Sequence, residues 1–110
     1  MKVLIIERHD GEGAFPTFPK GTVVENVKPC AESAHWLSCS INGLETYIPD
    51  LFLEGGVLLR DYDPTELVAE KGDYAEVRAI VYEWLYAINS RGAGGWIPAG
   101  KTVSARFVQP

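Results

Sequence analysis

The sequence predicts an all-β fold made of two small units in tandem, and three observations support this prediction. The two halves of the 110-residue chain repeat the same order of short motifs: Lys-Gly, then Trp-Leu, then Ile-Pro. An Asn-Gly pair, Asn42-Gly43, lies between apolar residues, which is the strongest short signal for a β-hairpin. β-Branched and aromatic residues are dense over residues 77–86, and such residues favour a pleated strand.

The repeat defines the predicted elements of each unit. These are an opening strand, a Lys-Gly turn with the strand after it, a strand that begins at Trp-Leu and a closing strand that ends at Ile-Pro. They fall at residues 3–6, 20–25, 36–37 and 43–49 in the first unit, and at residues 57–59, 71–76, 84–85 and 94–98 in the second. We therefore predict units at residues 1–54 and 55–110. Because the junction Glu54-Gly55-Gly56 is so short, we expect the units to pack closely together.

Residues 77–88 have an alternative interpretation as a helix. Apolar residues recur there at helical spacing: Val77, Ile80, Val81, Trp84, Leu85 and Ile88. The same stretch is rich in β-branched and aromatic residues, however, and the matching stretch of the first unit contains Pro29, which would cost about 3 kcal/mol inside a helix. Because duplicated units share a fold, strands are predicted here.

Composition and charge narrow the class of protein. Apolar residues make up 46% of the chain and charged residues 23%, as in chains that bury a core. The net charge of −5 and the lack of a Lys/Arg cluster argue against a nucleic-acid partner. The apolar runs are far shorter than the roughly 20 residues of a membrane span, and no extended apolar region follows the start. We therefore expect a cytoplasmic protein that has no membrane partner.

The two cysteines, Cys30 and Cys39, form a Cys-x4-His-x3-Cys array with His35. Structural zinc sites usually have four ligands in close pairs, and this array offers three. Two thiols in a reducing compartment are more often buried apolar groups than a disulfide. The sequence therefore predicts reduced cysteines, no metal and no cofactor.

From about Val57 to Val103, the second unit resembles an SH3 domain. Its opening Leu58-Leu59-Arg60-Asp61-Tyr62 is similar to the family's Ala-Leu-Tyr-Asp-Tyr signature, with Arg60 in place of the first tyrosine. Trp84 matches the family's ligand-facing tryptophan, and Gly95-Trp96-Ile97-Pro98 matches its closing motif. The resemblance implies an SH3-like β-barrel, and we expect Trp96, inside the closing strand, to lie in the core.

The first unit resembles the same family more distantly. Trp36 and Pro49 fall at the family positions, and Phe52 stands where the family has a tyrosine. Taken as a whole, the chain resembles small bacterial proteins built of two SH3-like barrels.

The resemblance also implies a binding site. SH3 grooves hold polyproline II segments between aromatic faces, while acidic loops contact a basic ligand residue. In the second unit the implied ligand-binding residues are Tyr62, Trp84 and Pro98, with Asp61, Asp63, Glu66 and Glu83 on the acidic side. In the first unit they are Trp36, Pro49 and Phe52.

These features favour a non-catalytic module that binds a protein or peptide, with a basic residue as one expected ligand feature. The sequence contains no nucleophile-elbow motif and no His-Glu-x-x-His motif, so no enzyme activity is predicted. One alternative is a structural or regulatory subunit whose barrels only pack within a larger complex, and a small-molecule or metal binder is a further one. The sequence does not determine the oligomeric state or the ligand.

Overall fold

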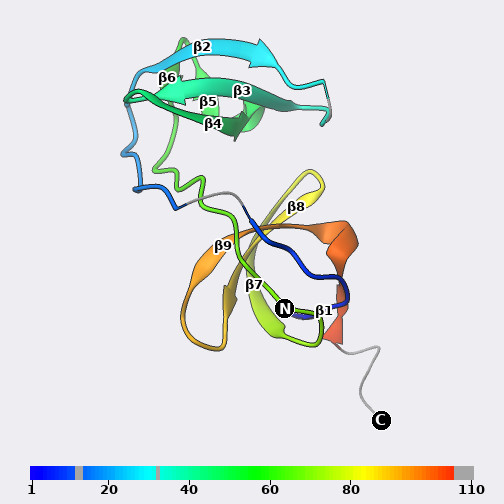
Figure 1. Cartoon of the computed structure of the whole chain (residues 1–110). Coiled ribbons are helices and arrows are strands. Elements are labelled where there is room, and N and C mark those ends of the chain that lie inside the picture. Colours follow the sequence, from blue (N-terminus) through cyan, green and yellow to red (C-terminus); the bar gives the residue numbers. More distant parts are fainter. Residues whose placement is uncertain (12–13, 32, 106–110) are drawn as a thin grey trace. The chain divides into compact units, whose positions relative to one another are not determined.

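The computed structural model describes residues 1–11, 14–31 and 33–105, and these residues are arranged in strands (Figure 1). The strands are β1 (Lys2–Ile5), β2 (Val24–Pro29), β3 (Trp36–Ile41), β4 (Leu44–Pro49), β5 (Leu53–Glu54), β6 (Val57–Leu58), β7 (Tyr74–Val81), β8 (Trp84–Asn89), β9 (Gly94–Pro98) and β10 (Thr102–Ser104). Two single-turn 3-10 helices, η1 (Asp50–Phe52) and η2 (Ala99–Lys101), complete the structure. The described part of the chain has no α-helix, so the all-β prediction is confirmed.

The chain divides into two compact units, and one interrupts the other in sequence. The discontinuous unit consists of Met1–Ala14 and Thr65–Pro110, and the inserted unit of Phe15–Pro64. The order along the chain is therefore nested rather than tandem, and it differs from the division expected at residue 54.

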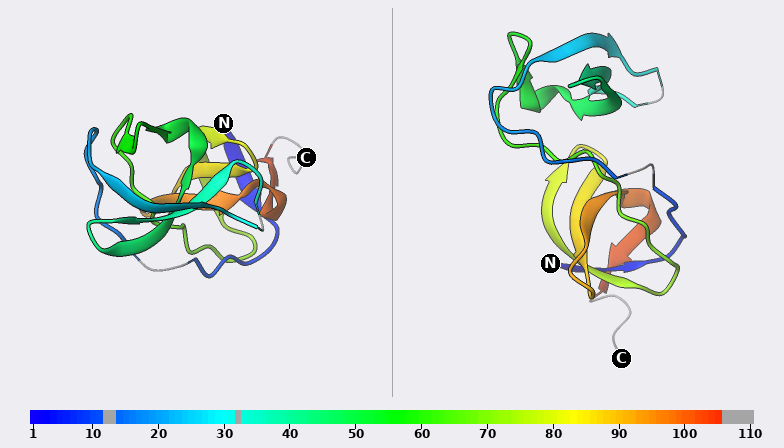
Figure 2. Two further views of the ribbon diagram at one scale, coloured as in Figure 1. Left: turned by 90° about the horizontal axis from the view of Figure 1, so that it is seen from above. Right: turned by 60° about the vertical axis from the view of Figure 1, so that its left-hand side comes forward.

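The discontinuous unit is built on a five-stranded antiparallel sheet in the order β10-β1-β7-β8-β9. The N-terminal strand β1 lies between β7 and the C-terminal strand β10, which can be followed by colour in Figure 2. Small and aliphatic side chains form its core: Val3, Ile5, Leu67, Ala69, Ala75, Leu85, Ala87 and Ile97. Alternate residues of β1 and β8 supply half of this core, as expected for a sheet with one buried face. β9 adds Ile97.

The inserted unit contains the three-stranded sheet β2-β3-β4 and the strand pair β5-β6. Between β3 and β4, Asn42 and Gly43 have φ angles of 50° and 80°, and Ile41 faces Leu44 across the turn. Two positive φ angles are what a two-residue hairpin turn requires. The predicted Asn-Gly hairpin is therefore confirmed. Among the described residues, the strands of both units form sheets without a closed barrel.

Residues 74–89 form a hairpin, so the strand prediction for this stretch is confirmed and the helical alternative is wrong. β7 and β8 are joined at Tyr82-Glu83, and Val81 faces Trp84 across the turn. Tyr82 has a φ of 55°, which is uncommon for a bulky residue and incompatible with a continuing α-helix.

The opening strands belong to different units than the sequence suggested. β6, expected to open the second unit, pairs with β5, and the turn between them is Gly55-Gly56, with φ angles of 61° and 78°. The expected junction is thus a tight hairpin turn. β1, expected to open the first unit, instead pairs with β7 and β10.

Candidate functional site

Trp84 begins β8 directly opposite Pro98, the last residue of β9. The next residue, Ala99, donates its backbone N–H to the carbonyl oxygen of Glu83 at 2.8 Å, where η2 begins. The Trp84 side chain is half-buried and Glu83 is exposed. Three of the predicted site residues, Glu83, Trp84 and Pro98, are therefore held together by local backbone pairing. Trp96 is buried, which confirms its predicted place in the core.

A fourth predicted residue, Glu66, connects to Trp84 through His9. A Glu66 carboxylate oxygen (Oε1) lies 2.7 Å from Nε2 of His9, and both side chains are largely buried. The His9 ring meets the Trp84 ring edge-on, with the ring centroids 6.0 Å apart. Backbone hydrogen bonds of 2.9 Å in both directions join His9 to Ala69 and fix its place beside the sheet.

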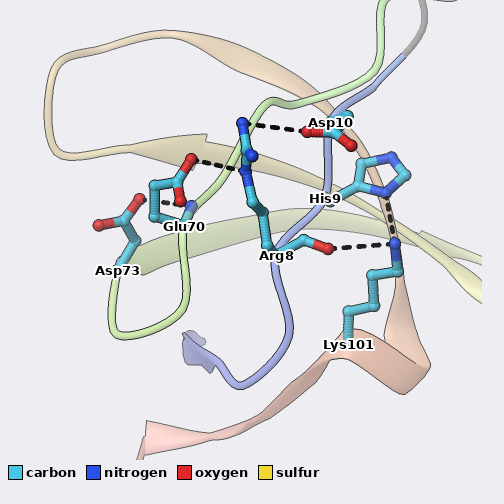
Figure 3. A network of polar contacts seen from close by, with 6 residues as sticks. All are labelled: Arg8, His9, Asp10, Glu70, Asp73 and Lys101. Atoms are coloured by element: carbon cyan, nitrogen blue, oxygen red, sulfur yellow. Dashed lines mark hydrogen bonds and ion pairs between the residues drawn. The ribbon is translucent and has the colours of Figure 1, made fainter.

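Lys101, at the end of η2, contacts the other side of the same histidine. Its ammonium nitrogen lies 3.0 Å from Nδ1 of His9 and 3.3 Å from the carbonyl oxygen of Arg8 (Figure 3). A carboxylate oxygen of Glu7 lies 3.8 Å from the same nitrogen. Because an ammonium group can only donate, Nδ1 accepts this hydrogen bond, and Nε2 carries the ring proton and donates to Glu66.

We define the Trp84 cluster as His9, Glu66, Glu83, Trp84, Pro98 and Lys101. Sequence reasoning missed His9 and Lys101 in this cluster. His9 precedes the inserted unit, so the repeat in the sequence places it in the first unit and Trp84 in the second. The nearest signal in the sequence for this cluster is that His9, Glu66 and Lys101 all lie outside strands. Polar residues outside strands are too common for this signal to identify a site.

Ion pairs beside the Trp84 cluster fix the segment that carries His9. Arg8 contacts the carboxylates of Asp10 at 3.0 Å and Glu70 at 2.9 Å, and the Glu70 backbone N–H donates to Asp73 (Figure 3). These side chains are exposed, and an exposed ion pair contributes at most about 1 kcal/mol. Their effect is to orient the Arg8 side chain away from His9 while its carbonyl oxygen accepts from Lys101.

The sequence predicts Tyr62 and Trp84 in one unit. In the structure, Tyr62 belongs to the inserted unit and Trp84 to the discontinuous unit. Its ring meets Phe52 edge-on at 5.5 Å, and its hydroxyl donates to the carbonyl oxygen of Tyr47 at 2.6 Å. The Arg60 guanidinium lies 4.8 Å from the centre of the Phe52 ring. Tyr62 and Phe52 are both buried, so they form part of the hydrophobic interior of the inserted unit.

The remaining predicted site residues are also in the inserted unit. Trp36 faces Pro49 across β3 and β4, and both are buried. Asp61 is exposed and accepts a hydrogen bond from the Lys20 backbone N–H at 2.8 Å, while Asp63 is half-buried. The expected acidic loop is thus divided, with Asp61 and Asp63 in one unit and Glu66 in the other.

Both cysteines are free thiols. Cys39 is buried on β3, and burial raises the pKa of its thiol to about 11. Cys30 is partly exposed. No group of three or more His, Cys, Asp or Glu side chains in residues 1–11, 14–31 and 33–105 is placed to hold a metal ion. Over the same ranges, no helix is long and apolar enough to span a membrane.

No protein-family model matches the sequence, and comparisons with curated proteins and with solved structures also give no match.

Proposed function

We propose that the chain is a non-catalytic protein- or peptide-binding module built of two SH3-like units, one inserted into the other. The observation that carries this proposal is the half-buried Trp84 ring opposite Pro98, with exposed Glu83 at its edge. The family resemblance assigns ligand contact to these positions, and the strand pairing holds them together.

A shared local arrangement in the two units supports the SH3-like assignment. In each unit a tryptophan begins one strand, a proline ends the next strand opposite it, and a 3-10 turn follows. The pairs are Trp36 with Pro49 before η1, and Trp84 with Pro98 before η2. Arrangements this similar are expected of duplicated units.

The chemistry of the Trp84 surface favours a proline-containing ligand with a basic residue. A partly exposed indole offers a flat apolar face on which a proline ring of a polyproline II segment packs. The Glu83 carboxylate is exposed beside it and attracts an Arg or Lys of the ligand. The net charge of −5 favours a basic partner at longer range.

The test is a titration of the isotope-labelled full chain with Pro-x-x-Pro peptides, with and without a flanking Arg, followed by NMR. We expect the Arg-containing peptide to shift the signals of Trp84 and of residues 98–102. Trp84→Ala should weaken binding by about 2 kcal/mol, a factor of roughly 30, while the fold survives.

Tyr74→Ala is the matched control, because Tyr74 is an exposed aromatic residue on β7 of the same sheet. It should leave binding unchanged. A folded Trp84→Ala variant with wild-type affinity would contradict the proposal, as would shifts confined to residues 15–64.

A structural or regulatory subunit is the second candidate, because the inserted unit exposes several large apolar side chains. Val23 and Leu51 are 59% and 60% exposed, and Leu59 is 41% exposed. The Leu59 backbone N–H donates to the carbonyl oxygen of Phe52, so Leu51 and Leu59 belong to neighbouring segments. Single exposed apolar residues are common on monomeric proteins, so this candidate stands second. If the chain is such a subunit, Leu51→Asp should disrupt assembly of its complex and leave peptide binding unchanged.

A further inference from the structure

We propose that His9 is a pH-sensitive positioning residue for the Trp84 cluster: protonation at Nδ1 breaks its hydrogen bond with Lys101 and so disconnects the η2 turn from the histidine ring that contacts Trp84. This goes beyond the proposed function, because it concerns a change in the free protein. Its consequence for binding rests on the proposed function.

The neutral state of His9 is defined from both sides of the ring. Glu66, on the segment before β7, accepts from Nε2 at 2.7 Å, and Lys101, on η2, donates to Nδ1 at 3.0 Å. The side chain of His9 is only 10% exposed, so water has little access to replace either partner. Among the contacts of the described residues, the charged groups at the ring are the Glu66 carboxylate and the Lys101 ammonium, and β8 contributes the neutral Trp84 ring.

Protonation of His9 leaves two donors facing each other. The new Nδ1–H would point at the Lys101 ammonium, which has no acceptor to offer and carries the same charge. Glu66 continues to accept from Nε2 and holds the charged ring in place, so Lys101 is the group that moves. Glu7 already lies 3.8 Å from the ammonium and receives it. Histidine is the side chain whose charge ordinarily changes between pH 5 and pH 8.

Movement of the Lys101 ammonium changes the link between the η2 turn and the His9 ring. Lys101 is the last residue of η2, which directly follows Pro98. The turn is closed by the Thr102 hydroxyl, which donates to the Ala99 carbonyl oxygen at 2.9 Å, and by the bond from the Ala99 N–H to Glu83. These bonds do not use the Lys101 ammonium, and the Lys101 carbonyl oxygen accepts from the Ile6 N–H at 2.8 Å, so the turn stays closed. Displacing the ammonium removes the link between η2 and the His9 ring, which contacts Trp84.

The experiment measures the full-length protein by NMR as the pH is lowered from about 8 to about 5. At the upper pH we expect the His9 proton on Nε2. On acidification, the Trp84 indole signal and the amide signals of residues 99–102 should follow the same titration curve as His9. A proton on Nδ1 at the upper pH would overturn the proposal. So would Trp84 and η2 signals that stay constant while His9 titrates.

Two variants separate positioning from a general effect of acid. In Lys101→Met, His9 should still titrate, but the coupled shifts of the η2 amides should be lost. If they persist, Lys101 does not transmit the change. His35→Gln alters the only other histidine, which lies in the inserted unit, and it should leave the whole response intact. The tautomer measurement on the wild-type protein decides the proposal even where a variant does not fold.

The Arg-containing Pro-x-x-Pro peptide tests the consequence for binding. When His9 is protonated, the affinity of the protein for this peptide should fall about fivefold, which is the effect of one hydrogen bond. In Lys101→Met the same change in pH should lower the affinity less than about twofold. Equal losses in both proteins would overturn the coupling to binding. A peptide that binds at neither pH would contradict the proposed function, and the NMR titration would still decide the role of His9.

Discussion

The β3-β4 hairpin of the inserted unit and the β8-β9 hairpin of the discontinuous unit have the same internal pairing and different surroundings. In both, a tryptophan faces a proline, the next residue is a leucine that faces an isoleucine, and a 3-10 turn follows. Yet Trp36 is buried at 8% exposure, whereas Trp84 remains half-buried beside His9. Local sequence therefore builds the hairpin, and segments distant in sequence decide whether its tryptophan is core or surface.

The segments that meet each hairpin differ in chemistry. In the inserted unit, Tyr62 is fixed by backbone bonds to Phe18 and packs on Phe52. In the discontinuous unit, backbone hydrogen bonds likewise join His9 to Ala69. The His9 side chain, however, forms a hydrogen bond with Lys101 in the η2 turn rather than packing on an apolar ring of that turn. One hairpin is thus supported by aromatic packing and the other by hydrogen bonds between ionisable side chains.

The largest expected difference is between the two tryptophans. Trp36→Ala should lower the free energy of unfolding of the inserted unit by about 4 kcal/mol, because it removes a buried aromatic side chain. Trp84→Ala should cost its own unit about 2 kcal/mol, since part of that ring is already in water. Urea unfolding, followed by NMR signals from each unit, measures both values. Equal losses would mean that the two rings are buried alike.

The next largest effect is expected at Gly95, which occupies the position in β9 that Thr46 occupies in β4. A Cβ at Gly95 would lie 2.5 Å from the backbone nitrogen of Leu67, so Gly95→Ala should destabilise the discontinuous unit by about 3 kcal/mol. Thr46 already carries a side chain at its position, and Thr46→Ala should cost about 1 kcal/mol. The same urea measurement applies. Tolerance of Gly95→Ala would show that the segment at Leu67 can move away from β9.

The smallest expected effect concerns the hydroxyl of Tyr62. Tyr62→Phe keeps the contact with the Phe52 ring and removes the 2.6 Å hydrogen bond to the Tyr47 carbonyl oxygen. It should lower the free energy of unfolding of the inserted unit by about 1 kcal/mol, with no dependence on pH near neutrality. Thermal unfolding at about pH 8 and about pH 6 checks both statements, and a pH-dependent loss would contradict the contrast with His9.

The hairpins could be predicted from sequence because their signals are local. Asn42-Gly43 supplies the turn residues, and the alternative of a helix over 77–88 fails because the chain reverses at Tyr82-Glu83. The nesting of the units could not be predicted in the same way, because pairing of β1 with β7 and β10 leaves no local mark. Gly55-Gly56 was the available clue. It is a typical hairpin dipeptide, although its place between the two repeats also fits a junction.

The candidate site was predicted in part. Trp84, Pro98 and Glu83 are joined within one hairpin and could be recognised from its motifs. The sequence groups Tyr62 with Trp84 because Tyr62 follows an apparent opening strand, but that strand pairs within the inserted unit. His9 and Lys101 are 92 positions apart, and only the fold brings them together.

The nested order of the units has a consequence for how the chain is made. β1 pairs with β7 and β10, at Leu4 with Tyr74 and at Val3 with Ser104, and all of residues 15–64 lie between these partners. During synthesis every strand of the inserted unit therefore leaves the ribosome before the first partner of β1 exists. Domains generally fold as units in the order of their synthesis, and contacts this distant in sequence form slowly. β1 is thus translated before the inserted unit but paired only after it, and its apolar residues stay without their strand partners during that interval.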